Sequence, residues 1–401
     1  MVIDKQKIFS ISQKKELVIF GAGYIADKTM NFGEDKFSFV LDNDDRKWNT
    51  VFRGKDVKNP EILNDLNKDE FFIVICCEDY NGVKEQLEKL GFIESKHFGI
   101  SVLLKNHFAF DTINKSSEQL LVTVTGKNGG LYLLNTRSGS YNIVHKGSMR
   151  GITVVDDFIW IVTDREGLWK LDFNLNILVK FENIDFYQPC GLTFDVKSNS
   201  FFVANTGTDE IFVIDANNGV VTKKIPLSDR YSITGKEQHH INDLIIINNS
   251  LFVSMFSKSG FWRNDIYDGG IKIYDLTKDM FCSDFYTELI KPHSIECFED
   301  KIYYCDSFNG IVYRGTSEII GKFHGFLRGI EKNGDLLYVG QSRNRHTDES
   351  FRLDHPTNIN TGIIIYLIKD KIYRFVNIND VTDIYGIIDL GKYIANEPER
   401  E

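Results

Sequence analysis

Arg150-Gly151-Ile152 is the first of six short motifs in which a small residue precedes an aliphatic one. The aliphatic residues of successive motifs lie 35 to 57 residues apart, and a second apolar segment such as 158–162 follows each of the first five motifs. Short strands that recur at this spacing, separated by Asn, Asp and Gly, are typical of the blades of a β-propeller. The other five motifs are Cys190-Gly191-Leu192, Asn242-Asp243-Leu244, His293-Ser294-Ile295, Arg328-Gly329-Ile330 and Tyr385-Gly386-Ile387.

The two ends of this repeat region predict how the ring closes. Residues 121–145 supply only three strands of a first blade, and residues 383–390 supply one strand that is left over. If the two segments share a blade, two exposed sheet edges disappear. We therefore predict an all-β six-bladed β-propeller over residues 120–390, in which the C-terminal strand completes the first blade, followed by a polar tail at 391–401.

A different pattern precedes the repeats. The apolar run at 16–20 ends in Gly21-Ala22-Gly23-Tyr24-Ile25, which predicts a buried strand, a tight glycine turn and the start of a helix. The next predicted strand ends at Asp42, 21 residues after Gly21, where dinucleotide-binding folds place an acid that binds ribose. We predict a Rossmann-like α/β domain of the nucleotide-binding type over residues 1–105 and a linker at 106–119.

This domain has candidate cofactors and one alternative. We expect NAD(P) or a nucleotide sugar at the glycine turn, and the alternative is a domain that packs without binding a nucleotide. About four β segments fit before residue 105, which makes hydride transfer the minority interpretation. The candidate cofactor-binding residues are Gly21, Gly23, Tyr24, Ile25 and Asp42.

Further motifs extend the pattern along this domain: Asp42-Asn43-Asp44 with Lys47-Trp48, Gly54 with Val57, Pro60 with Leu63, and the helix predicted from Tyr80 to Leu90. This succession resembles the small Rossmann-like domain found beside glycosyltransferases, sugar methyltransferases and sugar acyltransferases of bacterial surface-glycan pathways. The resemblance covers roughly residues 16 to 100. It implies a protein of surface-polysaccharide metabolism with glycan-pathway enzymes as partners.

The first strand of each propeller blade lines the central channel, so the residue before each small residue is expected to face it. These six residues include two arginines and a histidine, which together suit a carboxylate or phosphate. The alternative is that they satisfy carbonyl groups and waters inside the channel. The aromatic segment 254–263 and the basic segment 341–346 are expected at the rim. The candidate ligand-binding residues are Arg150, Asn242, Arg328, Tyr385, Trp262 and Arg343, and the ring also contains Cys190 and His293.

The third motif departs from the glycine rule in the segment Gln238-His239-His240-Ile241-Asn242-Asp243. This segment resembles the Asn-Asp strand of gluconolactonase, regucalcin and paraoxonase-type six-bladed (NHL-like) propellers, which hold a divalent cation near the axis. The resemblance implies Asn242, Asp243 and Glu296 as ligands of a cation such as Ca²⁺, with Asn205 and Asp306 as further oxygen donors. The next motif offers His293 or Ser294 where that family has an acid.

Three side chains are catalytic candidates. His240 and His293 suit a general base near neutral pH, and Asp243 would raise the basicity of either histidine by pairing with it. His239 is expected at the surface.

Composition narrows the partners. The chain has 401 residues and a net charge of −10 without a basic run, which disfavours nucleic acid and anionic membranes. It has no apolar run of the ~20 residues that cross a bilayer. Residues 1–15 resemble no signal peptide, so we expect a cytoplasmic protein. The six cysteines follow no disulfide or zinc spacing.

Together these features predict a cytoplasmic protein of surface-polysaccharide or sugar metabolism. The N-terminal domain would bind a nucleotide or nucleotide sugar, and the propeller axis would bind a small anionic sugar or sugar acid. If the protein is catalytic, a hydrolase, lyase or isomerase is expected. Two alternatives stay open: a non-catalytic propeller scaffold that recognises a protein or glycan, and a metal-dependent lactonase. The sequence indicates nothing about oligomeric state.

Overall fold

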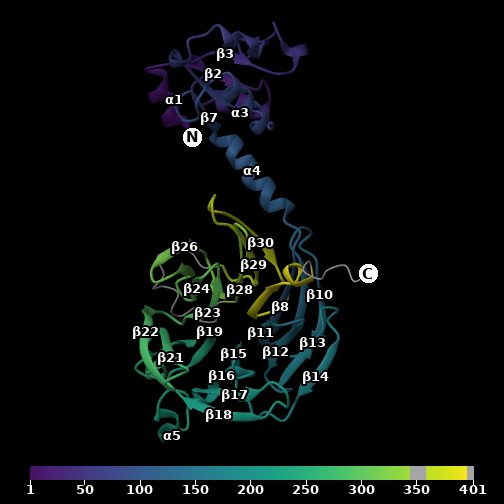
Figure 1. Ribbon diagram of the computed structural model, residues 1–401, viewed down its shortest axis with the longest axis vertical. Helices are drawn as coiled ribbons and strands as arrows, with labels where there is room; N and C mark the ends of the chain where they lie inside the picture. Colours follow the sequence, from purple (N-terminus) through teal and green to yellow (C-terminus); the bar gives the residue numbers. More distant parts are fainter. Residues whose placement is uncertain (344–357, 395–401) are drawn as a thin grey trace. The chain divides into compact units, whose positions relative to one another are not determined.

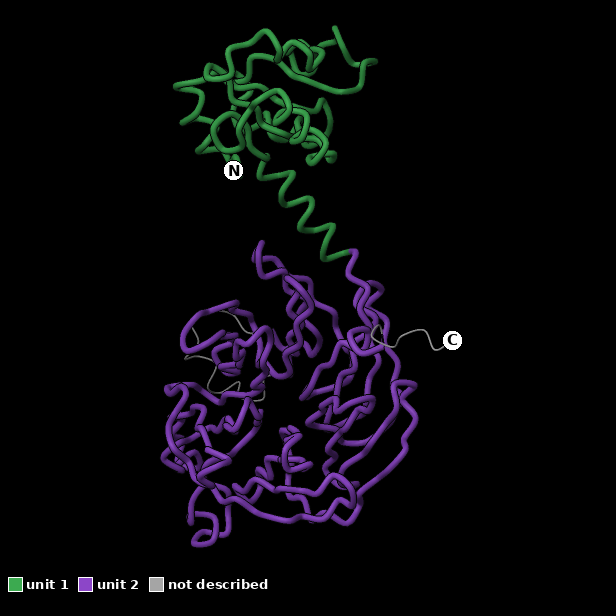
Figure 2. Tube along the Cα trace, in the orientation of Figure 1, with its two compact units in different colours: residues 1–114 green, residues 115–401 purple. Residues whose placement is uncertain are grey.

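The computed structural model describes residues 1–343 and 358–394. The chain divides into two compact units, residues 1–114 and 115–401 (Figure 2). Helix α4 (Val102–Lys115) occupies most of the segment that the sequence analysis assigns to a linker. Of the predicted polar tail, residues 391–394 form the short helix α6 (Gly391–Ile394), and 395–401 lie outside the described residues.

The first unit contains one seven-stranded sheet in the order β1-β7-β6-β2-β3-β5-β4. The paired strands run parallel except β4, which is antiparallel to β5. The expectation of about four strands is wrong because β1 and β4 have two residues each and β5 has four, too short to show an apolar pattern. The strands are β1 (Val2–Ile3), β2 (Glu16–Phe20), β3 (Phe37–Leu41), β4 (Val51–Phe52), β5 (Lys55–Lys58), β6 (Phe71–Ile75) and β7 (Phe98–Ser101).

Helices cover both faces of this sheet because successive strand residues point to opposite sides. On one face, Val18 and Phe20 of β2 share an apolar core with Leu87 of helix α3 (Tyr80–Lys89). On the other face, Leu17 and Ile19 pack with side chains of helices α1 (Lys5–Ser12) and α2 (Tyr24–Met30). Strand β2 therefore lies at the centre of the unit, and its carboxyl end leads directly into the glycine turn.

The second unit is a six-bladed β-propeller, as the repeat of the motifs predicts (Figure 1). Each blade is a sheet of four antiparallel strands. The first three blades, from the inner strand outward, are β31 (Asp383–Asp389), β8 (Gln119–Thr125), β9 (Gly130–Asn135) and β10 (Tyr141–Lys146); β11 (Met149–Val155), β12 (Phe158–Thr163), β13 (Leu168–Leu171) and β14 (Ile177–Phe181); and β15 (Pro189–Asp195), β16 (Ser200–Asn205), β17 (Glu210–Asp215) and β18 (Val221–Pro226).

The remaining three blades follow the same order, and the short helix α5 (Arg230–Thr234) comes between the third and the fourth. They are β19 (Ile241–Ile247), β20 (Ser250–Met255), β21 (Gly269–Asp275) and β22 (Met280–Leu289); β23 (His293–Phe298), β24 (Lys301–Asp306), β25 (Ile311–Arg314) and β26 (Glu318–Lys322); and β27 (Phe326–Asn333), β28 (Leu336–Ser342), β29 (Gly362–Leu367) and β30 (Ile372–Asn377).

The ring closes through strand β31, which pairs antiparallel with β8 and completes the first blade. Apolar side chains fill the space between the faces of successive blades, for example Phe201 and Phe212 of the third blade against Trp160 of the second. No helix among residues 1–343 and 358–394 is long and apolar enough to span a bilayer.

Every inner strand has an irregularity of its pairing at the motif found in the sequence. In β11 the register shifts between Met149 and Ile152, around Arg150 and Gly151, and the other five inner strands shift at the matching position. A β-bulge re-aims side chains and bends the strand. The bulges explain why the residue before each small residue turns toward the axis.

The small residues of the motifs are required by close contacts between neighbouring inner strands. A Cβ atom on Gly151 would lie 2.5 Å from the carbonyl oxygen of Cys190 in the next blade. Where the motif has no glycine, the side chain ties two blades together: Asp243 accepts a hydrogen bond of 3.0 Å from the backbone N–H of Ile295. Ser294 Oγ likewise accepts one of 2.6 Å from the N–H of Gly329. The departure of the third motif from glycine thus has a structural reason.

Candidate functional site

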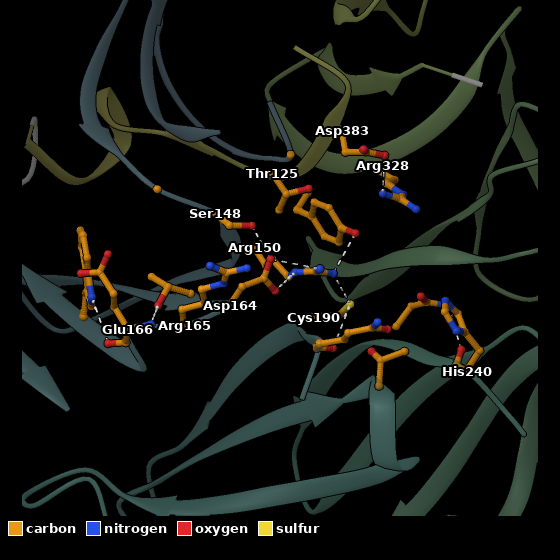
Figure 3. A pocket seen from close by; sticks show the side chains of 18 residues that line it. Thr125, Ser148, Arg150, Asp164, Arg165, Glu166, Cys190, His240, Arg328 and Asp383 are labelled. Carbon is orange, nitrogen blue, oxygen red and sulfur yellow. Dashed lines mark hydrogen bonds and ion pairs between the residues drawn. The ribbon is translucent and has the colours of Figure 1, made fainter. Parts of the chain in front are cut away.

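The six ring residues predicted from the motifs all line one continuous site on the propeller. A cavity of about 700 Å³ is lined by Arg150, Cys190, Asn242, Arg328 and Tyr385 (Figure 3). A constriction of about 20 Å³ next to it shares the last four of these residues with His293. The residues come from the inner strands of all six blades. The bulges therefore bring together side chains from positions as far apart as 150 and 385.

Arg150 has several partners on this surface. Its Nε lies 2.5 Å from Oδ1 of Asp164, and its Nη1 donates to the hydroxyl of Tyr385 at 2.9 Å and to Sγ of Cys190 at 3.2 Å. Ser148 Oγ donates to the other carboxylate oxygen of Asp164. Burial would lower the pKa of Arg150, but Tyr385, Cys190 and Asp164 together raise it above the usual range, so the guanidinium stays charged.

Arg328 and Tyr385 form the second half of the arrangement. The guanidinium carbon of Arg328 lies 4.6 Å from the centre of the Tyr385 ring, and that of Arg150 lies 4.8 Å from it. Arg328 Nη1 donates to Asp383 at 3.1 Å, and both side chains are 6% exposed. Arg328 Nε is buried and makes no hydrogen bond with any described residue. One donor of a buried guanidinium is thus left for a further partner.

His240 also lines the large cavity, and its backbone has a φ of 55°. The carboxylate of Asp209 holds this unusual backbone by accepting hydrogen bonds of 2.8 Å from the N–H groups of both His239 and His240. The imidazole ring lies between Phe256 and Trp262, with ring centres 4.3 Å and 4.6 Å away. Burial lowers the pKa of His240, although Glu237 acts in the opposite direction. Burial therefore favours the neutral form of the ring.

Glu237 is the acidic neighbour of the His240 ring. Its Oε1 lies 3.8 Å from His240 Nδ1, and Arg263 forms an ion pair with the same carboxylate. Burial would raise the pKa of Glu237, but His240 and Arg263 lower it to about 2. Trp262, predicted as a ligand-binding residue, is placed against His240 and does not line the cavity.

The other two histidines have structural partners. His293 lines only the constriction, and its Nδ1 lies 3.0 Å from both the carbonyl oxygen of Lys291 and Oγ of Ser307. The expected surface position of His239 is wrong, because the side chain is buried. Its ring nitrogens lie 2.8 Å from Ser228 Oγ and 2.9 Å from the carbonyl oxygen of Ser257.

Asp243 lines the constriction but not the large cavity. Together with Glu296 it lines a separate cavity of about 90 Å³. Its carboxylate accepts hydrogen bonds from the backbone N–H groups of Leu244 and Ile295, and no described histidine pairs with it. Burial raises the pKa of Asp243 to about 7. Burial, with the charges of Asp243 and Glu331, raises the pKa of Glu296 well above its usual range.

The residues expected to bind a cation are divided among neighbouring cavities. Asn242 lines the large cavity and the constriction, whereas Glu296 lines the small cavity beyond it. Asn242 Nδ2 donates to the carbonyl oxygens of His240 and Pro292. Within the part of the chain that the structure describes, no three His, Cys, Asp or Glu residues are grouped to hold a metal. At the blade ends, the side-chain oxygen Oδ1 of Asn205 accepts a hydrogen bond from the backbone N–H of Tyr187. Oδ1 of Asp306 accepts one from the backbone N–H of Ile290.

Several lining residues were not singled out by sequence reasoning. Asp164 follows the second strand of its blade, and Asp383 stands two residues before Tyr385. Both residues lie at the same end of the blade as the ring motif, and this shared position could have identified them as lining residues. The further residues that line the large cavity are Thr125, Gly126, Gly147, Ser148, Thr163, Arg165, Glu166, Trp169, Gln188 and Thr206.

Arg343 lies apart from this site. It is exposed and lines a different cavity with Lys127 and Asn360, and its backbone N–H donates to the carbonyl oxygen of Thr382. Residues 344–346 of the predicted basic rim lie outside the described residues.

The glycine turn of the first unit is held by Asp42. Asp42 Oδ2 accepts hydrogen bonds from the N–H of Ala22 at 2.7 Å and from Nζ of Lys47 at 2.9 Å, and Oδ1 accepts from the N–H of Asp44. Trp48 Nε1 donates to the carbonyl oxygen of Asp42. This network gives the Asp-Asn-Asp and Lys-Trp motifs a local structural role.

The other candidate residues of the turn differ in exposure. Gly21 has a φ of 106°, and a Cβ atom there would lie 2.8 Å from Cβ of Cys77. Gly23 and Tyr24 are exposed, and a Cβ atom on Gly23 would meet nothing within 4 Å. Ile25 is half-buried beside both apolar cores. The space in front of Gly23 is therefore open.

Comparisons with known proteins extend this description. A family model described as a domain of unknown function (DUF4915) matches residues 194–395. No curated protein matches the chain. A chain of a nidogen/laminin complex has a TM-score of 0.48 at 15% identity, covering 67% of this chain and 97% of that one. A protein of unknown function from Bacteroides caccae has a TM-score of 0.47 at 12% identity, covering 68% and 98%. The calcium-binding protein regucalcin from Agrobacterium tumefaciens has a TM-score of 0.39 at 14% identity, covering 59% and 74%.

Proposed function

Because the chain belongs to the DUF4915 family, whose description names no activity, we propose a function from the geometry of the channel: the propeller binds a small sugar-like ligand that carries a carboxylate or phosphate group. The observation that carries this proposal is the convergence of Arg150 and Arg328 on Tyr385 at the wall of the large cavity. Guanidinium groups bind such anions through parallel charge-assisted hydrogen bonds.

Arg328 supports the proposal in a second way. Its Nε is buried without a hydrogen-bond partner among the described residues. A buried donor left in this state costs about 1–3 kcal/mol. A shift of the Arg328 side chain toward a ligand oxygen in the cavity would satisfy the donor and recover that free energy on binding.

The charges around the cavity favour a ligand with one anionic group. Arg150 has Asp164 beside it and Arg328 has Asp383 beside it, so neither guanidinium acts as an isolated positive charge. The rest of the lining is rich in hydroxyl and amide groups such as those of Thr125 and Gln188. Such groups suit the hydroxyls of a sugar, which makes a sugar acid the preferred class.

A catalytic role would fall to His240. Burial favours its neutral form and it lines the same cavity as the two arginines, so it suits proton abstraction from a bound sugar acid. Hydrolysis, elimination and isomerisation all need such a base. A metal-dependent lactonase is the less favoured candidate, because Asn242 and Glu296 face different cavities.

The first unit is proposed as a Rossmann-like domain that holds NAD(P) or a nucleotide sugar. The strand order of its sheet reverses between β2 and β6, and ligands of open parallel sheets bind at the carboxyl ends of strands at such a point. The open space at Gly23 lies directly after β2. The Asp42 carboxylate already braces the turn, so the ribose would have to be bound by other groups. A nucleotide sugar here would support a role in surface-polysaccharide metabolism.

Calorimetric titration with glucuronate, gluconate, glucose 6-phosphate and glucose tests the propeller site. We expect the acids to bind and glucose to bind at least about tenfold more weakly, because it lacks the group that the guanidiniums recognise. Arg328→Lys keeps the positive charge but removes the planar set of N–H donors, so it should weaken binding of the acids. Arg343→Lys, in the other cavity, should leave their binding unchanged. Equal binding of glucose and glucuronate would contradict the proposal, and no binding of any of them would favour the scaffold alternative.

The nucleotide site is tested separately by thermal shift with NAD(P) and nucleotide sugars. Selective binding raises the unfolding midpoint, and Gly23→Asp should abolish the rise by placing a carboxylate where a phosphate would lie. A rise that persists in Gly23→Asp would place the nucleotide elsewhere.

A further inference from the structure

Cys190 is the one cysteine of the chain that lines the large cavity, and all six cysteines belong to the described residues. Its side chain is 4% exposed, so the cavity is its route to small molecules. Sγ lies 3.2 Å from Nη1 of Arg150, which donates to it, and 3.8 Å from the carbonyl oxygen of Gln188. A guanidinium N–H directed at sulfur stabilises the negative charge that sulfur carries as it attacks.

A second observation points to a ligand beside this thiol. Arg328 lines the same large cavity and the same constriction as Cys190, and its side chain is 6% exposed. Its buried Nε has no hydrogen-bond partner among the described residues. Figure 3 shows Arg150, Arg328 and Cys190 around one space. An anion bound by the arginines would therefore be held near the sulfur atom.

We propose that Cys190 is a nucleophile that adds reversibly to the aldehyde group of a small carboxylate-bearing aldehyde held by Arg150 and Arg328. The proposal rests on the anion site described under the proposed function and assigns its substrate class. Uronic acids such as glucuronate carry an aldehyde and a carboxylate in one molecule when they are in their open-chain form. They match both halves of the site.

The addition step needs no further reactant. A lone pair of Cys190 Sγ forms the C–S bond, and the π electrons of the carbonyl group move to its oxygen. The thiol proton ends on that oxygen, and the product is a hemithioacetal in which no atom has been oxidised or reduced. The Tyr385 hydroxyl and Cys190 Sγ both accept hydrogen bonds from Nη1 of Arg150, which makes this hydroxyl the candidate to pass the proton.

The direct test uses glyoxylate labelled with ¹³C at the aldehyde carbon, observed by NMR with the full chain. We expect a hemithioacetal carbon signal with the wild-type protein and its loss in Cys190→Ser. Glycolate, which has the carboxylate but no aldehyde, should bind the wild-type protein in calorimetry. If glycolate binds and no hemithioacetal forms, the nucleophile is refuted while the anion site stands. If glycolate and sugar acids fail to bind as well, both proposals fall.

Alkylation supplies a second measurement. Iodoacetate carries a carboxylate and iodoacetamide does not. At each cysteine, the rate of alkylation by iodoacetate divided by the rate with iodoacetamide therefore reports how strongly nearby arginines attract the carboxylate. We expect a ratio at Cys190 about tenfold higher than at the exposed Cys282, read by peptide mass spectrometry. Arg328→Gln should lower the ratio at Cys190 alone. A ratio at Cys190 equal to that at Cys282, or no labelling of Cys190, would overturn the proposal.

Discussion

The hydroxyl of Tyr385 accepts a hydrogen bond of 2.9 Å from Nη1 of Arg150, although the two residues are on inner strands 235 positions apart in the chain. The face of the same ring lies 4.8 Å from the guanidinium carbon of Arg150. Tyr385 thus orients the Arg150 guanidinium in two ways, through the hydrogen bond to its hydroxyl and through the contact with its ring. The proposed anion site depends on both contacts.

Tyr385→Phe separates these two contributions. The ring stays, but the hydrogen bond to a charged donor is lost, and such bonds contribute about 1.5–3 kcal/mol. We expect binding of glucuronate to weaken about tenfold or more, measured by calorimetry. The exposed Tyr373 provides the control, because Tyr373→Phe should leave the affinity unchanged. Unaltered affinity in Tyr385→Phe would show that the hydroxyl does not position Arg150.

The pH dependence of propeller stability should reflect Asp243. Burial raises its pKa from 3.8 to about 7, so the native state binds its proton more tightly than the unfolded state. The stability from this group is fully present below about pH 4 and is lost as the pH rises through 7. The loss should be on the order of 2 kcal/mol, given solvent in the channel.

Asp243→Asn tests this expectation, because it removes the titration. Urea unfolding followed by tryptophan fluorescence between pH 4 and 8 should show a flatter profile than in the wild type, although the absolute stability falls with the lost hydrogen bond to Ile295. Three of the four tryptophans lie in the propeller, so fluorescence reports mainly on that unit. Glu296→Gln should flatten the profile further. Parallel profiles for wild type and Asp243→Asn would contradict the assignment.

His240 should titrate below the ordinary histidine value of 6.5, because burial lowers its pKa. Protonation then costs native stability as the pH falls below 6.5. NMR of the imidazole protons gives the midpoint directly. Trp262→Ala, which uncovers one side of the ring, should move the midpoint upward. A wild-type midpoint at or above 6.5 would show that the ring is better solvated than its neighbours indicate.

Gly21→Ala and Gly23→Ala form a matched pair in the first unit. Gly21 has a positive φ and no room for a Cβ atom beside Cys77, so alanine there should destabilise the unit by about 1–3 kcal/mol. Gly23 faces open space, and alanine should change stability little. Hydrogen exchange of peptides from residues 1–114 measures both effects. Equal exchange in the two variants would mean that the turn relaxes freely.

Much of the propeller was predictable because one structural requirement repeats six times. Every inner strand bulges where it passes its neighbour, so each blade needs a small residue such as Gly151 there, and the residue before it faces the channel. This local rule is sufficient to assign Arg150, Arg328 and Tyr385 to one ring. Asp243 departs from this rule, and its side chain ties two blades together by accepting a hydrogen bond from Ile295.

Other features depend on neighbours that no local pattern reveals. Asp164 and Asp383 form ion pairs with Arg150 and Arg328 from positions outside the repeated motif. The motif alone therefore does not predict that each arginine of the cavity has an acidic neighbour. The spacing of Asp42 from Gly21 matches a ribose-binding acid, yet its carboxylate contacts Ala22 and Lys47. Strands of two residues, such as β1, owe their existence to a partner strand.

The pairing of β8 with β31 also has a consequence for biosynthesis. A ribosome delivers β8 first among the propeller strands and β31 last, after the other five blades have emerged. Throughout that interval the nascent chain carries a strand edge with nothing beside it, the state in which β-proteins most readily join another chain. Truncated or stalled polypeptides that lack β31 should therefore bind molecular chaperones strongly. The chain that contains β31 should need chaperones less, because it can close the ring as it folds.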